Sequence, residues 1–235
     1  MLAMMLIAHL IGDYVLQFNA LVRWKTHSLW GVLAHGTIVT TVTVIAAITV
    51  QPAWWTYALL IGVSHTLIDI VRARLVTPPT PGLDLLYFLL DQIAHLSVIA
   101  SVILWSQAPA QLPTWFEPRA IALVAGLLFL LQPAWVLLRF LVRGVWGESA
   151  APPLGSGEKY FPMLERVAIA LLALTGMGYL IPIALLPGRI ERLQGHEHNL
   201  MILIRGGDSW IENMLSILFA LGVGLGLRYL GLVTF

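Results

Sequence analysis

Long apolar runs, nearly free of charged side chains, recur along the chain. A helix needs about 20 mostly apolar residues, with a range of roughly 17 to 25, to cross a hydrocarbon core about 30 Å thick. The runs that we assign as spans are residues 2–18, 29–50, 54–71, 83–105, 120–142, 167–186 and 213–232. We therefore predict an all-α, polytopic transmembrane bundle of about seven spans, in which the first and shortest run is the least secure.

The composition excludes several classes of protein. Of the 235 residues, 59% are hydrophobic and 11% are charged, whereas a water-soluble domain carries about 25% charged residues. The formal net charge of +1 leaves no basic surplus for binding nucleic acid. The chain has no cysteine, which excludes disulfides, thiolate metal sites and iron–sulfur clusters. Any bound metal must therefore have nitrogen and oxygen ligands.

The basic residues predict an orientation. If the N-terminus lies outside, nine of the 13 Lys and Arg residues fall on the inner side, and cytoplasmic loops carry such an excess. We expect the N-terminus outside and the C-terminus inside. We also expect a four-helix unit over residues 1–106 and a three-helix unit over residues 107–235, with an inner linker at 143–165 and an outer loop at 188–212.

The ionisable residues inside the first four predicted spans are all His or Asp. They are His9, Asp13, His35, His65, Asp69, Asp91 and His95. Three pairs among them are spaced i, i+4, which places both members on one face of a helix. Because neighbouring spans run in opposite directions and a helix rises about 1.5 Å per residue, all seven can lie at one depth near the inner leaflet. Spacing and depth together predict a single cluster.

The cost of burying charge supports this cluster. An Asp at the centre of a membrane helix costs about 2.5–3.5 kcal/mol on insertion scales, so the three carboxylates should face one another and not lipid. Imidazoles and carboxylates suit zinc, manganese, iron or nickel, and the number of groups is enough for two ions, or for one ion with supporting carboxylates. A purely structural hydrogen-bonded network is the alternative.

We assign roles within the cluster and beside it. The preferred metal ligands are His9, His65, Asp69, Asp91 and His95, while Asp13 is a candidate general base and His35 a candidate ligand or proton shuttle. Arg72 and Arg74 follow Asp69 and could hold the phosphate of a substrate, although anchoring at the inner interface explains them as well.

Four further features are weaker. His196 and His198 in the outer loop could bind a metal, but a solvated loop explains them too. Gly222 and Gly226 form a face of small residues for helix packing, within this chain or against a partner. Pro133 predicts a kink in the fifth span. Arg166 opens the sixth span, where a structural role is favoured over a catalytic one.

Several segments resemble a known family. They are residues 9–17 (His-Leu-Ile-Gly-Asp-Tyr-Val-Leu-Gln), the isolated His35, residues 64–69 (Ser-His-Thr-Leu-Ile-Asp) with the two arginines that follow, residues 90–95 (Leu-Asp-Gln-Ile-Ala-His) and residues 164–166 (Leu-Glu-Arg). Together they resemble the bacterial membrane family catalogued as domain of unknown function 3307, most strongly over residues 1–100. A weaker likeness runs to inner-membrane metal-dependent hydrolases. The resemblance implies a multi-pass protein of the bacterial inner membrane and supplies no activity.

Three classes of function fit these features. The first is metal-dependent hydrolysis of a lipid-like or phosphorylated substrate, with a divalent metal as cofactor. The second is metal or proton translocation, since chains of intramembrane carboxylates and imidazoles also mark relays. The third is an accessory or structural subunit of a larger membrane complex. The expected partners are membrane lipids and a further copy of the chain or another membrane protein, and not nucleic acid.

Overall fold

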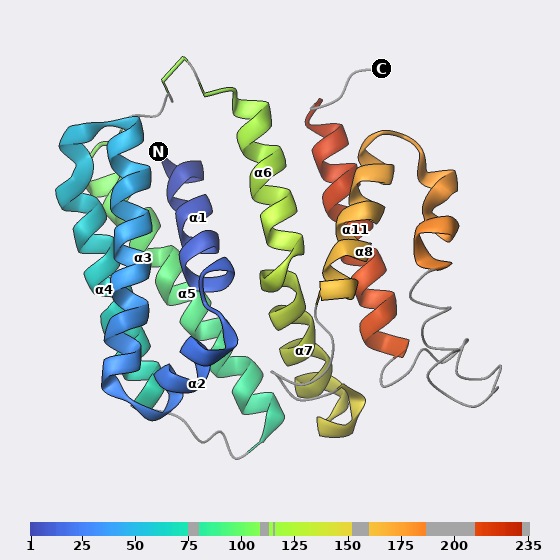
Figure 1. Cartoon of the computed structure of the whole chain (residues 1–235), viewed down its shortest axis with the longest axis horizontal. Helices are drawn as coiled ribbons and strands as arrows, with labels where there is room; N and C mark the ends of the chain where they lie inside the picture. The colour runs from blue at the N-terminus through green and yellow to red at the C-terminus, as the bar shows by residue number, and fades with distance from the viewer. Residues whose placement is uncertain (75–79, 109–112, 115, 152–159, 187–209, 232–235) are drawn as a thin grey trace. The chain divides into compact units, whose positions relative to one another are not determined.

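The computed structural model describes residues 1–74, 80–108, 113–114, 116–151, 160–186 and 210–231. These residues form helices and turns without a strand (Figure 1), which confirms the all-α prediction. The chain divides into two compact units. Unit 1 comprises Met1–Pro79 and Leu86–Ala125, and unit 2 comprises Thr80–Leu85 and Gly126–Phe235. The predicted cluster residues all belong to unit 1.

Unit 1 is built mainly from the N-terminal helices. They are α1 (Leu2–Leu10), a π-helical turn (Ile11–Val15), α2 (Asn19–His27), α3 (Leu29–Val50), a 3-10 turn (Pro52–Trp54), α4 (Trp55–Arg74) and most of α5 (Pro81–Trp105). α3 begins at a cap in which the Ser28 hydroxyl accepts a hydrogen bond from the Trp30 N–H at 3.2 Å. It ends before Pro52, because a residue preceding proline is disfavoured in the helical conformation.

α3 and α4 interlock through two reciprocal pairs of glycine and threonine. A Cβ atom on Gly36 would collide with the side chain of Thr66, and one on Gly62 would collide with that of Thr40. Each threonine hydroxyl donates within its own helix, Thr40 to the Gly36 carbonyl at 2.6 Å and Thr66 to the Gly62 carbonyl at 2.9 Å. Small residues let helix backbones approach closely in membranes. This approach brings the neighbouring residues His35 and His65 together.

Unit 2 contains α7 (Gln132–Trp146), α8 (Tyr160–Leu174), α11 (Trp210–Tyr229) and the C-terminal part of α6 (Pro118–Leu130). The chain bends by 44° between α6 and α7, which confirms the kink predicted at Pro133. α8 packs on α11 at Gly224, where a Cβ atom would meet Ala170 and Ala173. A Cβ atom added at Gly222 or Gly226 would meet no atom of another element within 4 Å among the described residues, so the packing role of this face, within the chain or against a partner, stays a prediction.

Four helical segments are long and apolar enough to cross a membrane, namely Leu29–Val50, Pro52–Arg74, Pro81–Trp105 and Trp210–Tyr229. The number rises to six if each of two bent pairs forms one span: Leu2–Val15 with Asn19–His27, bent by 84°, and Pro118–Leu130 with Gln132–Trp146. By length and composition, these helices suit a membrane protein. The count of seven and the orientation stay predictions.

The predicted span 167–186 differs from the structure. α8 ends at Leu174 and the chain turns at Gly176, whose φ of +78° is a left-handed conformation that suits glycine. Helical structure resumes only in short pieces, through Gly178–Leu180 and residues 181–186. Most of the predicted outer loop, with His196 and His198, and the central part of the inner linker lie outside the described residues.

Candidate metal site

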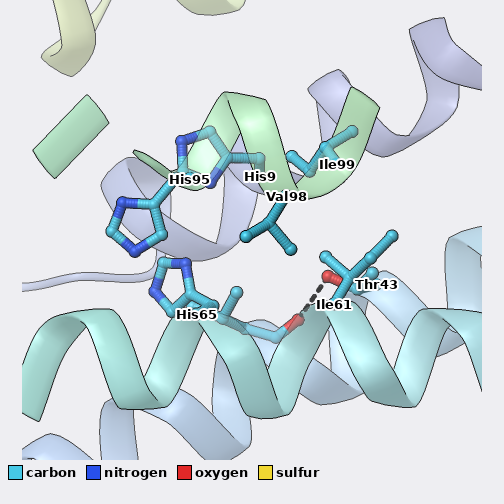
Figure 2. A pocket seen from close by; sticks show the side chains of 8 residues that line it. His9, Thr43, Ile61, His65, His95, Val98 and Ile99 are labelled. Carbon is cyan, nitrogen blue, oxygen red and sulfur yellow. Dashed lines mark hydrogen bonds between the residues drawn. The ribbon is translucent and has the colours of Figure 1, made fainter. Parts of the chain in front are cut away.

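The structure brings all seven predicted His and Asp residues into one cluster in unit 1, in which six are buried and the Asp91 side chain is 12% exposed. His9 comes from α1, Asp13 from the π-helical turn, His35 from α3, His65 and Asp69 from α4, and Asp91 and His95 from α5. His35 is 0% exposed, and the exposed fractions of His65 and Asp69 are each 3%. Figure 2 shows the rings of His9, His65 and His95 gathered beside one another.

The π-helical turn gives Asp13 its position. The Leu16 N–H donates to the Ile11 carbonyl at 2.9 Å, five residues back, where an α-helix would bond four residues back. The wider turn buries Gly12, Asp13 and Tyr14 in succession. Gly12 lies directly against α3, since a Cβ atom there would be 3.1 Å from the Val39 Cα. Such π-bulges occur frequently at functional sites.

Asp13, His35 and His65 form the tightest group of potential ligand atoms. The Asp13 Oδ1 lies 3.0 Å from the His35 Nε2 and 3.7 Å from the His65 Nε2, and the two Nε2 atoms are 3.4 Å apart. A tetrahedral ion with bonds of about 2.0–2.1 Å separates its ligand atoms by about 3.3–3.4 Å. The three observed distances bracket this value, so the group matches the spacing of a tetrahedral site.

Asp69 adds a second carboxylate to the same two imidazoles. Its Oδ2 lies 3.4 Å from the His35 Nε2 and 3.6 Å from the His65 Nε2. His65, Asp69 and His95 form a second group whose ligand atoms all lie within 4.8 Å of one another. Since His65 belongs to both groups, the two groups describe one connected site.

His9, Asp91 and His95 surround these groups more loosely. The His9 Nε2 is 3.9 Å from the Asp13 Oδ2, and the His95 Nδ1 is 3.7 Å from the Asp91 Oδ2, beyond the range of a hydrogen bond. The His9 Nε2, both ring nitrogens of His95 and the Asp91 Oδ1 are buried without a hydrogen-bond partner among the described residues. Buried polar atoms of this kind are rare in folded proteins, and each calls for an explanation such as an ion or a water.

The structure groups the predicted residues by distance. Asp13, predicted as a general base, and His35, predicted as a ligand or proton shuttle, lie with His65 in a group that could hold a metal ion. His9 and Asp91, predicted as ligands, belong to neither three-residue group. The seven residues form the predicted cluster, and the role of each residue as a ligand, general base or proton shuttle stays a prediction.

Sequence reasoning missed three polar partners of the cluster. The Lys25 Nζ donates to the Asp69 Oδ2 and to the Gln17 Oε1, both at 3.0 Å. The Tyr14 hydroxyl donates to the Gln92 Oε1 at 2.8 Å, and the Gln92 Nε2 donates to the Asp91 Oδ2 at 3.0 Å. Tyr14 and Gln92 each adjoin a cluster aspartate in sequence, which is a usable signal. Lys25 lies between the first two predicted spans, where a lysine indicates only an inner loop and not a contact with the cluster.

The two arginines predicted to bind substrate lie at the end of α4. The Arg72 guanidinium stands over the Tyr87 ring, 5.7 Å from its centroid, an arrangement that a cation–π contact favours. Arg74 is exposed at the last position of the helix. Their role in substrate binding stays a prediction.

A small cavity adjoins the cluster. His9, His65 and His95 line one side, and apolar residues with Thr43 line the other (Figure 2). Its volume of about 10 Å³ is close to the minimum that a single water molecule requires. The unpartnered nitrogens of His9 and His95 can supply hydrogen bonds to such a water.

Comparison with known proteins finds one family. The model of the family described as protein of unknown function (DUF3307) matches residues 1–123, a range that includes every residue of the cluster. No curated protein and no solved structure matches the chain. The resemblance predicted from the sequence motifs is confirmed, and the weaker likeness to inner-membrane metal-dependent hydrolases has no support.

Proposed function

The chain belongs to the DUF3307 family of proteins of unknown function, and we propose that it is a metal-dependent hydrolase of the bacterial inner membrane. The proposed substrate is a lipid-like or phosphorylated molecule, and the site lies near the cytoplasmic leaflet. The observation that carries the proposal is the spacing of the Asp13 Oδ1, His35 Nε2 and His65 Nε2, at 3.0 to 3.7 Å from one another, on three buried residues.

The donor atoms indicate the class of metal. Two imidazoles with one or two carboxylates suit zinc, and also manganese, iron or nickel, whereas calcium and magnesium prefer oxygen ligands alone. Asp13, His35 and His65 would hold the ion with Asp69 as a further ligand, and the ion would take a water molecule as an additional ligand. The hydrogen-bonded Tyr14 and Gln92 beside the cluster support this assignment, because such outer partners orient metal ligands and tune the ion.

The chain also provides groups for handling a proton. A bound divalent metal would lower the pKa of a water molecule to about 7 and so supply a nucleophile. The cavity beside His9, His65 and His95 offers room for one water. His9 and His95 have ring nitrogens with no hydrogen-bond partner among the described residues, so either can accept a proton from that water. The Tyr14 hydroxyl and the Gln92 amide hold the Asp91 carboxylate in place behind them.

Translocation of a metal ion or a proton is the second candidate. The observation that favours it is a continuous series of imidazoles, in which the ring centroids of His35 and His65 are 5.5 Å apart, those of His65 and His95 4.1 Å, and those of His95 and His9 5.5 Å. The far wall of the cavity, formed by Val39, Ile61, Val98 and Ile99 with Thr43, carries no further titratable group, and the Thr43 hydroxyl donates to the Val39 carbonyl at 2.8 Å. We therefore rank it below hydrolysis.

Metal analysis combined with turnover tests the proposal. The full chain is purified in detergent, and its metal content is measured beside the hydrolysis of phospholipid and phosphomonoester substrates. We expect the wild type and a His27→Ala control to retain metal and turnover, because His27 is an exposed histidine on α2. Asp13→Asn and His35→Ala should lose both.

Two results would contradict hydrolysis. Equal metal content in the wild type and an Asp13→Asn, His35→Ala double variant would remove the site. Stoichiometric metal without turnover, together with transport in proteoliposomes that the same substitutions abolish, would instead establish translocation. Copurification in a stoichiometric complex whose activity is unchanged by these substitutions would support an accessory role.

A further inference from the structure

Lys25 connects the buried cluster with its surroundings. Its Nζ lies 3.0 Å from the Asp69 Oδ2, and its side chain is 20% exposed, against 3% for that of Asp69. The Gln17 Oε1 accepts a second hydrogen bond from the ammonium at 3.0 Å. One end of the Lys25 side chain thus touches the site, while part of the side chain stays accessible.

The packing of α2 holds Lys25 in this position. α2 lies directly on α3 at Gly31, where a Cβ atom would collide with the backbone of Trp24 and Lys25. Leu21, one turn earlier in α2, is buried with 3% exposure. Because the Lys25 backbone is in contact with α3, the ammonium does not reach Asp69 merely through the freedom of a surface side chain.

Lys25 and a metal ion would compete for one oxygen atom. The Asp69 Oδ2 that accepts from Lys25 is the same atom that faces the His35 Nε2 at 3.4 Å and the His65 Nε2 at 3.6 Å. A zinc ion bound to a carboxylate oxygen lies about 2.0–2.2 Å from it. Two cations on one oxygen at these distances repel each other strongly in a buried environment.

The charges of the cluster indicate how a bound metal would change the surroundings of Lys25. In ionised form, Asp13, Asp69 and Asp91 carry three negative charges and Lys25 carries one positive charge, so the set has a net charge of −2 with neutral imidazoles. One divalent ion neutralises it. A metal bound by Asp13 and Asp69 accounts for two of the three carboxylates, so Asp91 still balances the Lys25 charge, but from a distance, because Lys25 makes its hydrogen bonds to Asp69 and Gln17. Without Asp69 as its contact partner, the partly buried ammonium attracts another anionic oxygen.

We propose that Lys25 is the anion-binding group of this site and that metal binding activates it by taking Asp69 away. The ligand is the anionic oxygen of a phosphate group, whether of a phosphorylated lipid headgroup or of a soluble phosphate ester, since an ammonium binds phosphate as a point charge. This inference rests on the proposed metal site. It assigns the anion to Lys25, in addition to the two arginines that the sequence suggested.

Binding measurements on the full chain in nanodiscs of phosphatidylcholine test the inference. Zinc affinity is measured first, and inorganic phosphate is then titrated into the zinc-loaded and zinc-free protein. We expect phosphate to bind at least about tenfold more tightly to the zinc-loaded wild type. Lys25→Met should lose this gain and bind zinc more tightly, because the competing ammonium is gone. Lys25→Arg, which keeps the positive charge, should retain phosphate binding.

A neighbouring cation provides the matched control. Arg23 lies on the same helix and is exposed, so Arg23→Met should leave both affinities unchanged. A second set of nanodiscs that contain phosphatidic acid separates the two sources of phosphate. If a lipid headgroup is the ligand, phosphatidic acid should weaken binding of inorganic phosphate to the wild type. Without that competition, a soluble phosphate ester is the ligand.

The outcomes separate this inference from the proposed function. If the wild type binds no zinc, the metal site fails and the inference fails with it. If the wild type binds zinc but Lys25→Met binds phosphate as tightly as the wild type does, only the role of Lys25 is overturned. Weaker zinc binding by Lys25→Met would also overturn it, since the ammonium would then support the ion and not compete with it. Should Lys25→Met not fold, Lys25→Gln is compared with Lys25→Arg in the same way.

Discussion

The two units of the molecule bury polar side chains in opposite ways. In unit 2, the Arg166 guanidinium donates to the Leu130 carbonyl at 2.8 Å, to the Leu131 carbonyl at 3.3 Å and to the Ser216 hydroxyl at 3.1 Å. In unit 1, the buried His9 Nε2 and both ring nitrogens of His95 have no hydrogen-bond partner among the described residues. The Arg166 guanidinium therefore has hydrogen-bond acceptors within the chain, whereas these nitrogens of His9 and His95 have no partner among the described residues.

This difference separates a structural polar network from a candidate binding site. Arg166 completes the bend between α6 and α7, and the Arg139 Nε pairs with the Glu212 Oε1 at 2.6 Å. The indole nitrogen of Trp135 is buried without a hydrogen-bond partner in the described part of the chain, but its ring contacts the Arg139 guanidinium. Buried charged side chains occur in both units, so they alone would indicate a functional site in each. The unpartnered atoms favour unit 1, because burying them without a ligand is unfavourable.

The largest expected effect concerns His65, which both three-residue groups share. His65→Ala should weaken metal binding by more than about 100-fold, the upper range for residues that support a metal only from outside. A titration against a competing chelator measures this change. Arg166→Met, as the control in unit 2, should bind metal like the wild type. Equal losses of metal affinity in the two variants would show that the effect reflects folding. They would contradict the distinction between a binding site in unit 1 and a structural network in unit 2.

Arg166 itself should matter for stability. Arg166→Met leaves the Leu130 carbonyl without this donor, and we expect a loss of roughly 3 kcal/mol in the free energy of unfolding. Denaturant unfolding in detergent micelles measures it. An unchanged unfolding midpoint would mean that the bend between α6 and α7 does not depend on the guanidinium.

The contact between α3 and α4 links stability to the site. Gly36→Ala places a methyl group against Thr66 and should lower stability by about 1–3 kcal/mol, the usual range for overpacking. It should also weaken metal binding, because it moves His35 away from His65. Gly222→Ala is the matched control, since the added carbon would meet no described atom of another element within 4 Å. If both variants behave like the wild type, the interlocked threonines do not position the histidines.

The smallest expected effect has the opposite sign. His95→Leu removes two buried nitrogens that have no hydrogen-bond partner among the described residues, so the metal-free protein should be unchanged or more stable by up to about 1 kcal/mol. Metal-loaded protein should lose part of its stabilisation, because a ligand that binds only the folded state stabilises it. Thermal unfolding with and without zinc measures both. Strong destabilisation without metal would show that His95 has a structural partner.

Much of the site could be predicted because its residues are ionisable and lie within apolar runs of the sequence. His35 and Asp69 stand out in apolar runs, and the cost of leaving them in lipid predicts that they meet. Lys25 gave no such signal, since a lysine between two spans is the ordinary mark of an inner loop. Its contact with Asp69 depends on the 84° bend after α1 and on the absence of a side chain at Gly31.

Helix contacts were predicted less well than helices. The glycines at 222 and 226 suggested a packing face, but α11 turns Gly224 toward α8. The predicted sixth span is interrupted at Gly176, although its composition alone is that of a membrane helix. Hydropathy measures how many apolar residues a segment has, and it does not register where the backbone turns or which side of a helix meets a neighbour.

The sequence by itself determined that this chain is helical, that it has segments apolar enough for a membrane, and that seven His and Asp residues are drawn together, because solvation energy depends on composition and local spacing. Only the tertiary structure decided which atoms face one another. The π-helical turn at Asp13, the close approach of α3 and α4 and the position of Lys25 arise from backbone packing between residues distant in sequence. Those contacts distinguish atoms poised to bind a ligand from atoms that the protein itself satisfies.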